Sequence, residues 1–409
     1  MSTVTCPECG ESNPTTVGRC FACGADLLGL ARAPRFGGVL SMLDVAEVTK
    51  VDSVKPDAPD TEERPLTEPA RPPLPDPLAL AVDPPIVGRD EALEVMRETI
   101  ARALSSSKSA LVVFEGDRGL GKTRMLREAG AMALVKDPRT RILYAASREG
   151  GDGPYAPFSR LLLDRFRITP STGPTAVRGQ MATEVGEALE TPDAAAVGET
   201  THLLGHIAGV PFPGSPVLRA LEGEPELLRI RAGRALRRLL EGDARKAPTM
   251  LLLDNAHFGG EDGWALLDAI VQARRVPLIV VVAGGTGTIA RTQSLEPELD
   301  AQRALLHPLD ETQVAEALRG LLPHLSEVPE PLAAAAFHRS KGNPAALREL
   351  CFGLVDAGLF RVTAAELGPS LDVEIDRLED GELPLNIDDV MRGRLARLDE
   401  TERQTLRNA

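Results

Sequence analysis

A glycine-rich stretch, GDRGLGKT at 116–123, has the residue types and spacing that hold phosphate groups. It matches the pattern G-x-x-x-x-G-K-[ST] and lies between an apolar run and an amphipathic one, the strand–loop–helix context that gives the pattern its meaning. Glycines let backbone N–H groups turn inward around phosphates, and the following helix adds the positive end of its dipole. We expect Lys122 to bridge the β- and γ-phosphates and the Thr123 hydroxyl to bind Mg²⁺.

A second residue with a side chain suited to nucleotide chemistry is Asp254, which ends the apolar run MLLLD. Its carboxylate is expected to hold Mg²⁺, mainly through water. The next residue, Asn255, stands where many nucleotide hydrolases have a second acid, and an amide can orient a water but cannot accept its proton. Slow hydrolysis is therefore expected, with bound nucleotide stabilising one conformation. Glu261 and Asp262 could replace the acid, although a solvated loop is the preferred interpretation for both.

Four cysteines near the N-terminus form two Cys-x-x-Cys pairs, Cys6/Cys9 and Cys20/Cys23. Each pair presents two thiolates on one side of a turn, and four thiolates complete a tetrahedral zinc site with no open position for catalysis. Zinc is favoured over iron, and in so small a unit the metal would supply most of the folding free energy. Residues 1–27 are similar to the bacterial zinc ribbons that precede signalling modules.

The hydrophobic pattern predicts the elements that position the phosphate-binding residues. Short apolar runs alternate with amphipathic helical segments, which predicts an α/β fold with the parallel sheet of a P-loop NTPase. The expected strands are 110–115, 141–146, 249–254, 277–283 and 303–307. The long stretch between the second and third strands is predicted to be mostly helical. The pattern predicts a sheet domain at 86–308. Resemblance to a family of P-loop ATPases implies a helical lid at 309–380 and the start of a winged-helix segment at 381–409.

Residues 28–85 are expected to form a linker. Ten prolines lie between 51 and 85 among scattered acids, and such a composition cannot bury enough apolar surface to fold. The more apolar stretch VLSMLDVAEV at 39–48 could dock on a partner or on the next domain. A weakly ordered tether is the preferred interpretation.

Composition narrows the classes of partner and location. The 409 residues carry a formal net charge of −14, which argues against a broad basic surface for DNA and disfavours nucleic acid as a partner. The net charge does not exclude a local basic patch. The sequence shows neither a signal-peptide pattern nor an apolar run near the roughly 18 residues of a membrane span, so we expect a cytoplasmic protein without membrane contact.

Five segments occur in the order typical of signal-transduction P-loop ATPases of the STAND group. They are IVGRDEAL, GDRGLGKTRML, PYAPFSRLL, LLLDNAHF and RSKGNPAALREL. Residues 85–409 resemble most the AAA-like ATPase modules of LuxR-type regulators and of bacterial proteins that pair cyclase or kinase domains with tetratricopeptide repeats. The resemblance implies ATP/ADP and Mg²⁺ as cofactors.

The resemblance also implies roles for individual residues. Val87, Gly88 and Arg89 match a motif that helps to bind adenine and ribose, and Pro344 matches a lid proline that packs near the base. Alone, Gly342-Asn343-Pro344 would indicate a helix-initiating turn. The expected nucleotide site comprises Val87, Gly88, Arg89, Gly116, Asp117, Arg118, Gly119, Leu120, Gly121, Lys122, Thr123, Arg124 and Pro344. Lys122, Asp254 and Asn255 form the expected catalytic group, and Thr123 and Asp254 the magnesium ligands.

The sequence departs from the family pattern around His257. Asn255 replaces an acid, Phe258 replaces a tryptophan, and the polar–arginine sensor expected after VVVAGGTG is missing, although Thr286 could contribute. These departures affect turnover more than binding. The last residues resemble the first helices of a winged-helix segment and stop before its wing. Either the chain is a fragment or it relies on a partner.

Three functions remain open at this level. The leading one is an ATP-dependent signalling switch with protein partners at the zinc ribbon and the lid. Nucleotide-dependent oligomerisation is compatible with such a switch. The alternatives are a non-hydrolysing scaffold and a DNA-associated ATPase similar to origin-recognition proteins. Among weaker signals, His202 and His206 are interpreted as packing residues, Arg237 and Arg238 as a solvated helix face, and Cys351 as a buried apolar residue.

Overall fold

The computed structural model describes residues 3–5, 12–14, 80–81, 83–150, 153–155, 157–169, 171–191, 193–273, 275–293, 300–325, 327–365 and 368–374. Cys6, Cys9, Cys20 and Cys23 lie outside these residues, as do most of the predicted linker and the predicted winged-helix segment. At the N-terminus, β1 (Thr3–Thr5) and β2 (Ser12–Pro14) pair antiparallel.

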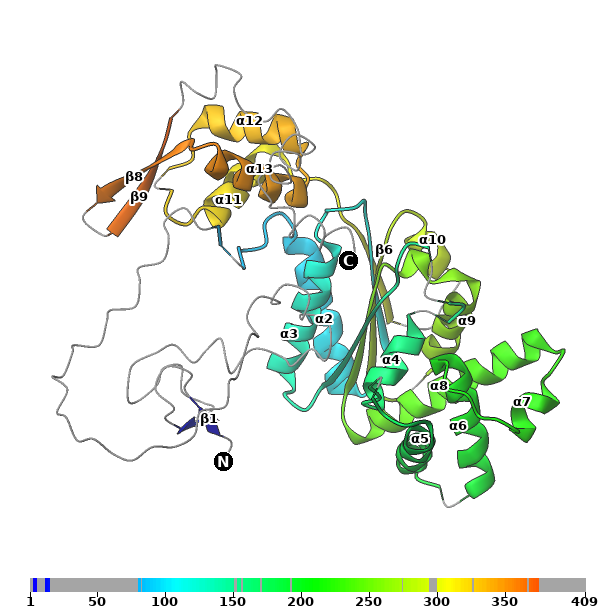
Figure 1. Ribbon diagram of the computed structural model, residues 1–409. Coiled ribbons are helices and arrows are strands. Elements are labelled where there is room, and N and C mark those ends of the chain that lie inside the picture. Colours follow the sequence, from blue (N-terminus) through cyan, green and yellow to red (C-terminus); the bar gives the residue numbers. More distant parts are fainter. Residues whose placement is uncertain are drawn as a thin grey trace, which may run out of the picture.

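A five-stranded sheet in the order β4-β5-β6-β3-β7 lies at the centre of the molecule (Figure 1). All its neighbouring strands are parallel, which confirms the predicted α/β fold of the P-loop NTPase type. The strands are β3 (Ala110–Glu115), β4 (Arg141–Ala146), β5 (Thr249–Asp254), β6 (Leu278–Gly284) and β7 (Asp300–Leu305). The last begins three residues earlier than the expected 303–307.

Alternating residues of the strands face two separate cores. Val112 and Phe114 of β3 pack with Met96 and Met125 on the face covered by α2 (Asp90–Ser106) and α3 (Lys122–Lys136). Val113 faces the opposite core, which the long helical stretch between β4 and β5 covers as predicted (Figure 1). That stretch forms α4 (Phe158–Arg165), α5 (Pro174–Leu189), α6 (Ala194–Ala208), α7 (Pro216–Ala220) and α8 (Pro225–Lys246). Farther along, α9 (Gly260–Val271) packs on α8, and α10 (Thr288–Gln293) follows β6.

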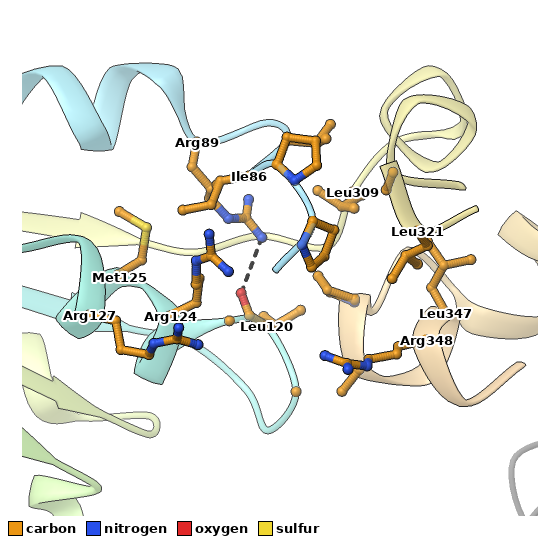
Figure 2. A pocket seen from close by; sticks show the side chains of 18 residues that line it. Ile86, Arg89, Leu120, Arg124, Met125, Arg127, Leu309, Leu321, Leu347 and Arg348 are labelled. Carbon is orange, nitrogen blue, oxygen red and sulfur yellow. Dashed lines mark hydrogen bonds between the residues drawn. The ribbon is translucent and has the colours of Figure 1, made fainter. Parts of the chain in front are cut away.

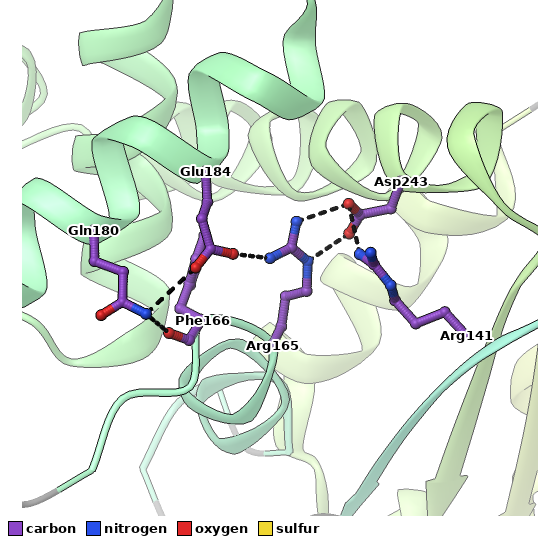
Figure 3. Close-up of polar contacts among 6 residues, drawn as sticks. All are labelled: Arg141, Arg165, Phe166, Gln180, Glu184 and Asp243. Atoms are coloured by element: carbon purple, nitrogen blue, oxygen red, sulfur yellow. Dashed lines mark hydrogen bonds and ion pairs between the residues drawn. The ribbon is translucent and has the colours of Figure 1, made fainter. Parts of the chain in front are cut away.

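A buried ion network holds this second helical layer to the amino end of β4 (Figure 3). Arg165 of α4 donates to both carboxylate oxygens of Asp243 on α8, at 2.6 and 2.7 Å, and also contacts Glu184 of α5. Arg141, the first residue of β4, pairs with the same aspartate at 2.9 Å. Burial lowers the pKa of Arg165, but its hydrogen bonds and ion pairs with Asp243 and Glu184 outweigh that effect and raise it.

Three helices and a hairpin after β7 form a unit that we call the helical subdomain. It comprises α11 (Glu311–Leu321), α12 (Glu330–Ser340), α13 (Pro344–Asp356), β8 (Phe360–Ala365) and β9 (Gly368–Val373). Its own core contains Leu318, Leu332 and Leu347, and Leu371 of the hairpin joins them. The hairpin lies within the range 309–380, which was expected to be a helical lid. Strands form there because apolar and polar residues alternate, a pattern that favours a strand. Of the helices that are described, none is long and apolar enough to cross a membrane.

Candidate functional site

The loop at 116–123, which we call the P-loop, joins the carboxyl end of β3 to the first turn of α3. Gly119 and Gly121 have φ values of +86° and +89°, a region that favours glycine. A Cβ built on Gly121 would meet nothing within 4 Å, so the space beside its backbone is open. A ligand can therefore approach the loop's backbone directly, as phosphate binding requires.

Lys122 places a cation at the centre of the P-loop. Its ammonium group donates hydrogen bonds of 2.8 Å to the carbonyl oxygens of Gly116 and Asp117. Burial lowers the pKa of Lys122, and the charges of Asp254 and Asp117 act in the opposite direction. A partly desolvated ammonium beside open backbone N–H groups attracts an anion more strongly than a solvated one does.

Asp254 and Thr123 bring two hard oxygen ligands together beside that cation. The Thr123 hydroxyl donates to Oδ2 of Asp254 at 2.6 Å, and the backbone N–H of Asn255 donates to Oδ1 at 2.8 Å. The Tyr144 hydroxyl donates to Oδ2 from 3.4 Å, and burial followed by the Asp254 charge raises the pKa of Tyr144, which keeps it a donor. Mg²⁺ takes one or two such protein oxygens together with phosphates and water, so these residues fit it.

No cage of three or more His, Cys, Asp or Glu side chains occurs within the described ranges. A magnesium ion shared with phosphates does not need such a cage. The four N-terminal cysteines, for which zinc is predicted, lie outside those ranges.

A cavity of about 770 Å³, which we call the strand-end cavity, opens at the carboxyl ends of β3, β4, β5 and β6. Such strand ends are where ligands bind in open α/β sheets. Lys122, Thr123, Asn255 and the sequence-noted Thr286 all line it. So do three residues that the sequence did not single out, Ser147, Arg148 and Glu149, which follow β4. Their only signal was their position directly after a predicted strand.

His257 connects the ends of β5 and β6 beside this cavity. Its Nδ1 accepts a 3.0 Å hydrogen bond from the backbone N–H of Gly285, so the neutral ring carries its proton on Nε2. Burial, followed by the charge of Lys122, lowers the pKa of His257, while Asp254 and Glu149 act in the opposite direction. The imidazole is therefore neutral near pH 7 and available as a hydrogen-bond donor.

Glu261 and Asp262 lie in the first turn of α9 and form ion pairs, instead of lying on a solvated loop. Glu261 pairs with Arg291, and Asp262 pairs with Arg229 at 2.6 Å. Neither lines the strand-end cavity. The structure therefore does not place either carboxylate where the acid missing at Asn255 would act.

A second cavity, of about 320 Å³, lies between the sheet and the helical subdomain, and we call it the interdomain cavity (Figure 2). Val87 and Leu309 give it apolar walls, and Pro344 of the helical subdomain also lines it. Arg124 lies on one side and Arg348 on the other (Figure 2). An apolar cavity with few polar groups at its rim is typical of a site for a flat organic ring.

Arg89 ties the segment before α2 to both the P-loop and the end of β7. Its guanidinium donates to the carbonyl oxygens of His307 at 2.6 Å, Gly88 at 3.1 Å and Leu120 at 3.4 Å. Burial lowers the pKa of Arg89. Val87 and Arg89 line the interdomain cavity, whereas Gly88 has φ +67° and lies against the Gln313 side chain.

The first turn of α13 rests directly on the P-loop. The Asn343 side chain donates a 2.8 Å hydrogen bond to the carbonyl oxygen of Arg118, and the Ala345 N–H donates to that of Gly119 at 3.2 Å. Gly119, Gly121 and Ala345 line both cavities, so the two are neighbours at the P-loop. Neighbouring cavities of these two kinds suit a ligand with an apolar ring at one end and anionic groups at the other.

Residues 85–282 match the family described as AAA ATPase domain. This part of the chain is similar to AAA ATPase domains. A protein of Rhizobium meliloti (strain 1021), described as uncharacterised, is 27% identical to it over 284 residues, which are 65% of this chain and 25% of the relative. This chain thus spans about a quarter of that relative's length.

Two solved structures are also similar to the chain. The Aeropyrum pernix ORC1 protein in complex with DNA has a TM-score of 0.37 and 18% identity, covering 70% of this chain and 63% of that one. Drosophila ORC bound to DNA has a TM-score of 0.44 and 13% identity, covering 86% and 73%. Similarity at this level says nothing about the ligands or partners of this chain.

The residues behind the weaker sequence signals have packing roles, in the sheet domain or in the helical subdomain. Nδ1 of His202 shares a 2.9 Å hydrogen bond with the Ser215 hydroxyl, and His206 lies edge-on to Tyr155. Arg237 donates to Gln272 of the neighbouring helix end at 3.1 Å. Cys351 is fully buried in the helical subdomain.

Proposed function

We propose that the protein is an ATP-dependent signal-transduction switch of the STAND type with slow hydrolysis. The observation that supports it most is the contact of α13 with the P-loop, through Asn343 and Ala345. A phosphate chain that reshapes the loop's backbone changes the carbonyl groups that this helix binds. The position of the helical subdomain then depends on which nucleotide is bound, as in other nucleotide switches.

Each part of the proposed site has a task that its chemistry suits. The base lies in the interdomain cavity against Val87 and Pro344, and the phosphates follow the P-loop to Lys122. Thr123 and Asp254 hold Mg²⁺, which when bound neutralises charge on the β- and γ-phosphates. Asn255 lines the cavity but cannot take a proton from water, which supports holding over rapid turnover.

The proposed output is a change of protein partner. The helical subdomain acts as a lid that exposes or hides a partner surface, and the segment with Cys6, Cys9, Cys20 and Cys23 binds zinc and recruits a partner. We place this switch in the cytoplasm, and its association into oligomers would depend on nucleotide.

The deciding experiment titrates labelled ATP and ADP onto the purified chain with Mg²⁺ and then follows phosphate release in a single turnover. Lys122→Ala is expected to abolish binding, because it removes the cation of the P-loop. Wild type is expected to bind ATP tightly and to release phosphate slowly, and Asn255→Asp to release it faster. Rapid release by wild type would contradict the holding switch, and failure to bind either nucleotide would leave a scaffold.

A further inference from the structure

The sheet order places the end of β4 directly beside the end of β5, where Asn255 lies. Ala146 and Asp254 are register partners, and the Ser147 N–H extends the ladder by donating to the Asp254 carbonyl at 3.0 Å. Glu149 follows two residues later. It lies in a turn with Gly150, just past the end of β4.

Three observations favour Glu149 as an acid that acts at the strand-end cavity. It lines the strand-end cavity together with Lys122, Thr123 and Asn255. Its charge acts on the imidazole of His257, which lies beyond Asn255 on the neighbouring strand end. Glu149 is exposed, so its carboxylate is open to water.

Only two acidic side chains line this cavity, among the residues that the structure describes, Asp117 and Glu149. Asp117 belongs to the P-loop itself, where its carbonyl binds the Lys122 ammonium. Glu149 is instead on the side of the cavity formed by β4 and β5. The Ser147 hydroxyl, two residues before Glu149, is buried and has no hydrogen-bond partner in the described structure.

We propose that Glu149, in the turn after β4 and so beside the strand that ends in Asp254, is the general base that replaces the acid missing at Asn255. This inference rests on the proposed function. The oxygen of a water forms a bond to the γ-phosphorus, and the bond from that phosphorus to the β–γ bridging oxygen breaks. ADP leaves with the bridging oxygen and its electron pair. One water proton passes to the Glu149 carboxylate and then to solvent, and the other stays on the phosphate released.

Asn255 has a complementary role in this arrangement. Its φ of +51° and ψ of +36° form a left-handed turn, which Asn and Asp both tolerate. The turn leaves its amide in the cavity, where it orients the water whose proton Glu149 accepts. Asn255 orients the water and Glu149 accepts its proton, and the two residues follow different strands. Turnover is slow because both side chains must be in place at the same time.

The test uses the full chain and measures ATP affinity and single-turnover phosphate release separately. Glu149→Gln is expected to lower the release rate at least about 100-fold, since a general base contributes roughly 10²–10⁴-fold. ATP affinity should change by less than about threefold, because the carboxylate binds the water and not the nucleotide. Glu261→Gln is the matched control, an exposed acid paired with Arg291 outside the cavity, and is expected to leave both quantities unchanged.

A double variant separates proton transfer from a structural role of Glu149. Asn255→Asp restores an acid directly after β5, so Glu149→Gln combined with Asn255→Asp is expected to recover release to at least the wild-type rate. A double variant as slow as Glu149→Gln would overturn the proposal, as would loss of release in Asp117→Asn with normal release in Glu149→Gln. Wild type that binds ATP without any release overturns this inference alone, whereas absence of ATP binding overturns the proposed function itself.

Discussion

The Asn343 side chain joins two segments that are 225 residues apart in sequence, because its amide donates to the carbonyl oxygen of Arg118 at 2.8 Å. Its Oδ1 at the same time accepts hydrogen bonds from the N–H groups of Ala345 and Ala346, at 3.1 and 3.2 Å. One side chain therefore both caps α13 and docks that helix on the P-loop. Loss of the cap and loss of the docking contact are separable by experiment.

Asn343→Ala should weaken the coupling between nucleotide and the helical subdomain. We expect a loss of about 1 kcal/mol in the free energy of unfolding from the missing cap. ATP affinity should also fall, and the backbone amides of α13 should exchange hydrogen faster in the ATP-bound protein. Chemical denaturation, ATP titration and hydrogen exchange measure these effects.

Asp310→Ala is the control for that prediction. Asp310 caps α11 with a 2.8 Å hydrogen bond from the Gln313 N–H, within a complete capping box, and lies outside both cavities. It should cost a similar amount of stability and leave ATP affinity unchanged. Equal effects of the two variants on ATP affinity would mean that the docking contact of Asn343 does not matter.

Asp243→Ala should destabilise the sheet domain strongly. The side chains of Asp243 and Arg165 are only 2% and 8% exposed, so removing the aspartate leaves a buried guanidinium paired with Glu184 alone. Breaking a buried pair in this way costs about 3–5 kcal/mol. Glu94→Gln removes an exposed pair with Arg97 and should change the free energy of unfolding by less than about 1 kcal/mol. Urea denaturation of both variants compares them, and similar losses would contradict a special role for the buried network.

The three histidines of the sheet domain with shifted pKa values should make the native state less stable in mild acid. Burial lowers the pKa of His202 below its ordinary 6.5, and the same direction holds for His206 and His257. Below about pH 6.5 the unfolded chain therefore binds more protons than the folded one, and stability falls as pH falls. His202→Gln removes one contribution while it can still bond to Ser215.

The measurement for His202 is the free energy of unfolding of wild type and His202→Gln at about pH 7.5 and about pH 5.5. The advantage of wild type over the variant should shrink at the lower pH. A constant difference would show that the pKa of His202 is not lowered on folding.

Cys351 should not react with thiol reagents in the folded protein. It is fully buried, and burial raises the pKa of its thiol to about 12, which leaves almost no thiolate at pH 8. Native Cys351→Ala should therefore label like wild type, while the denatured variant loses one of the five thiols. Labelled Cys351 in peptides from the native protein would contradict this expectation.

Because native Cys351 is not expected to be labelled, the same assay reports on the N-terminal cysteines. If Cys6, Cys9, Cys20 and Cys23 bind zinc, a chelator should release the metal and make four thiols reactive without unfolding the sheet domain. The measurement is zinc release together with thiol labelling. Full reactivity before chelation, or no zinc in the purified chain, would contradict the zinc ribbon.

Two strands around the P-loop, β3 and β5, were readable from sequence because they are buried on both faces and give continuous apolar runs. The ranges 110–115 and 249–254 match the observed bounds, as does 141–146 for β4, an edge strand in which buried and partly exposed residues alternate. In β7 the pattern is weaker, since DAQRAL mixes polar and apolar residues and Leu305 is half exposed, and its predicted range was displaced toward the carboxyl end. The hairpin β8–β9 was missed because a helical lid was expected over its whole range.

The position of Glu149 could not be predicted, although the strand before it was. Chain order gives β4 before β5 but does not show that they are neighbours, since more than 100 residues, most of them in helices, separate the two strands. Only the observed sheet order brings the end of β4 beside Asn255. Likewise, GNP suggested a turn that begins a helix, and nothing local revealed that Asn343 also binds the P-loop.

The close approach of Gly119 and Asn343 restricts how this chain can evolve. A Cβ at residue 119 would lie 2.4 Å from Oδ1 of Asn343, and the backbone there already has φ +86°. A larger residue in the loop is therefore compatible only with a smaller or displaced one at the start of α13. Among descendants of this sequence the two positions should covary, and a recombinant that takes one from a distant relative should lose function until the other is exchanged as well.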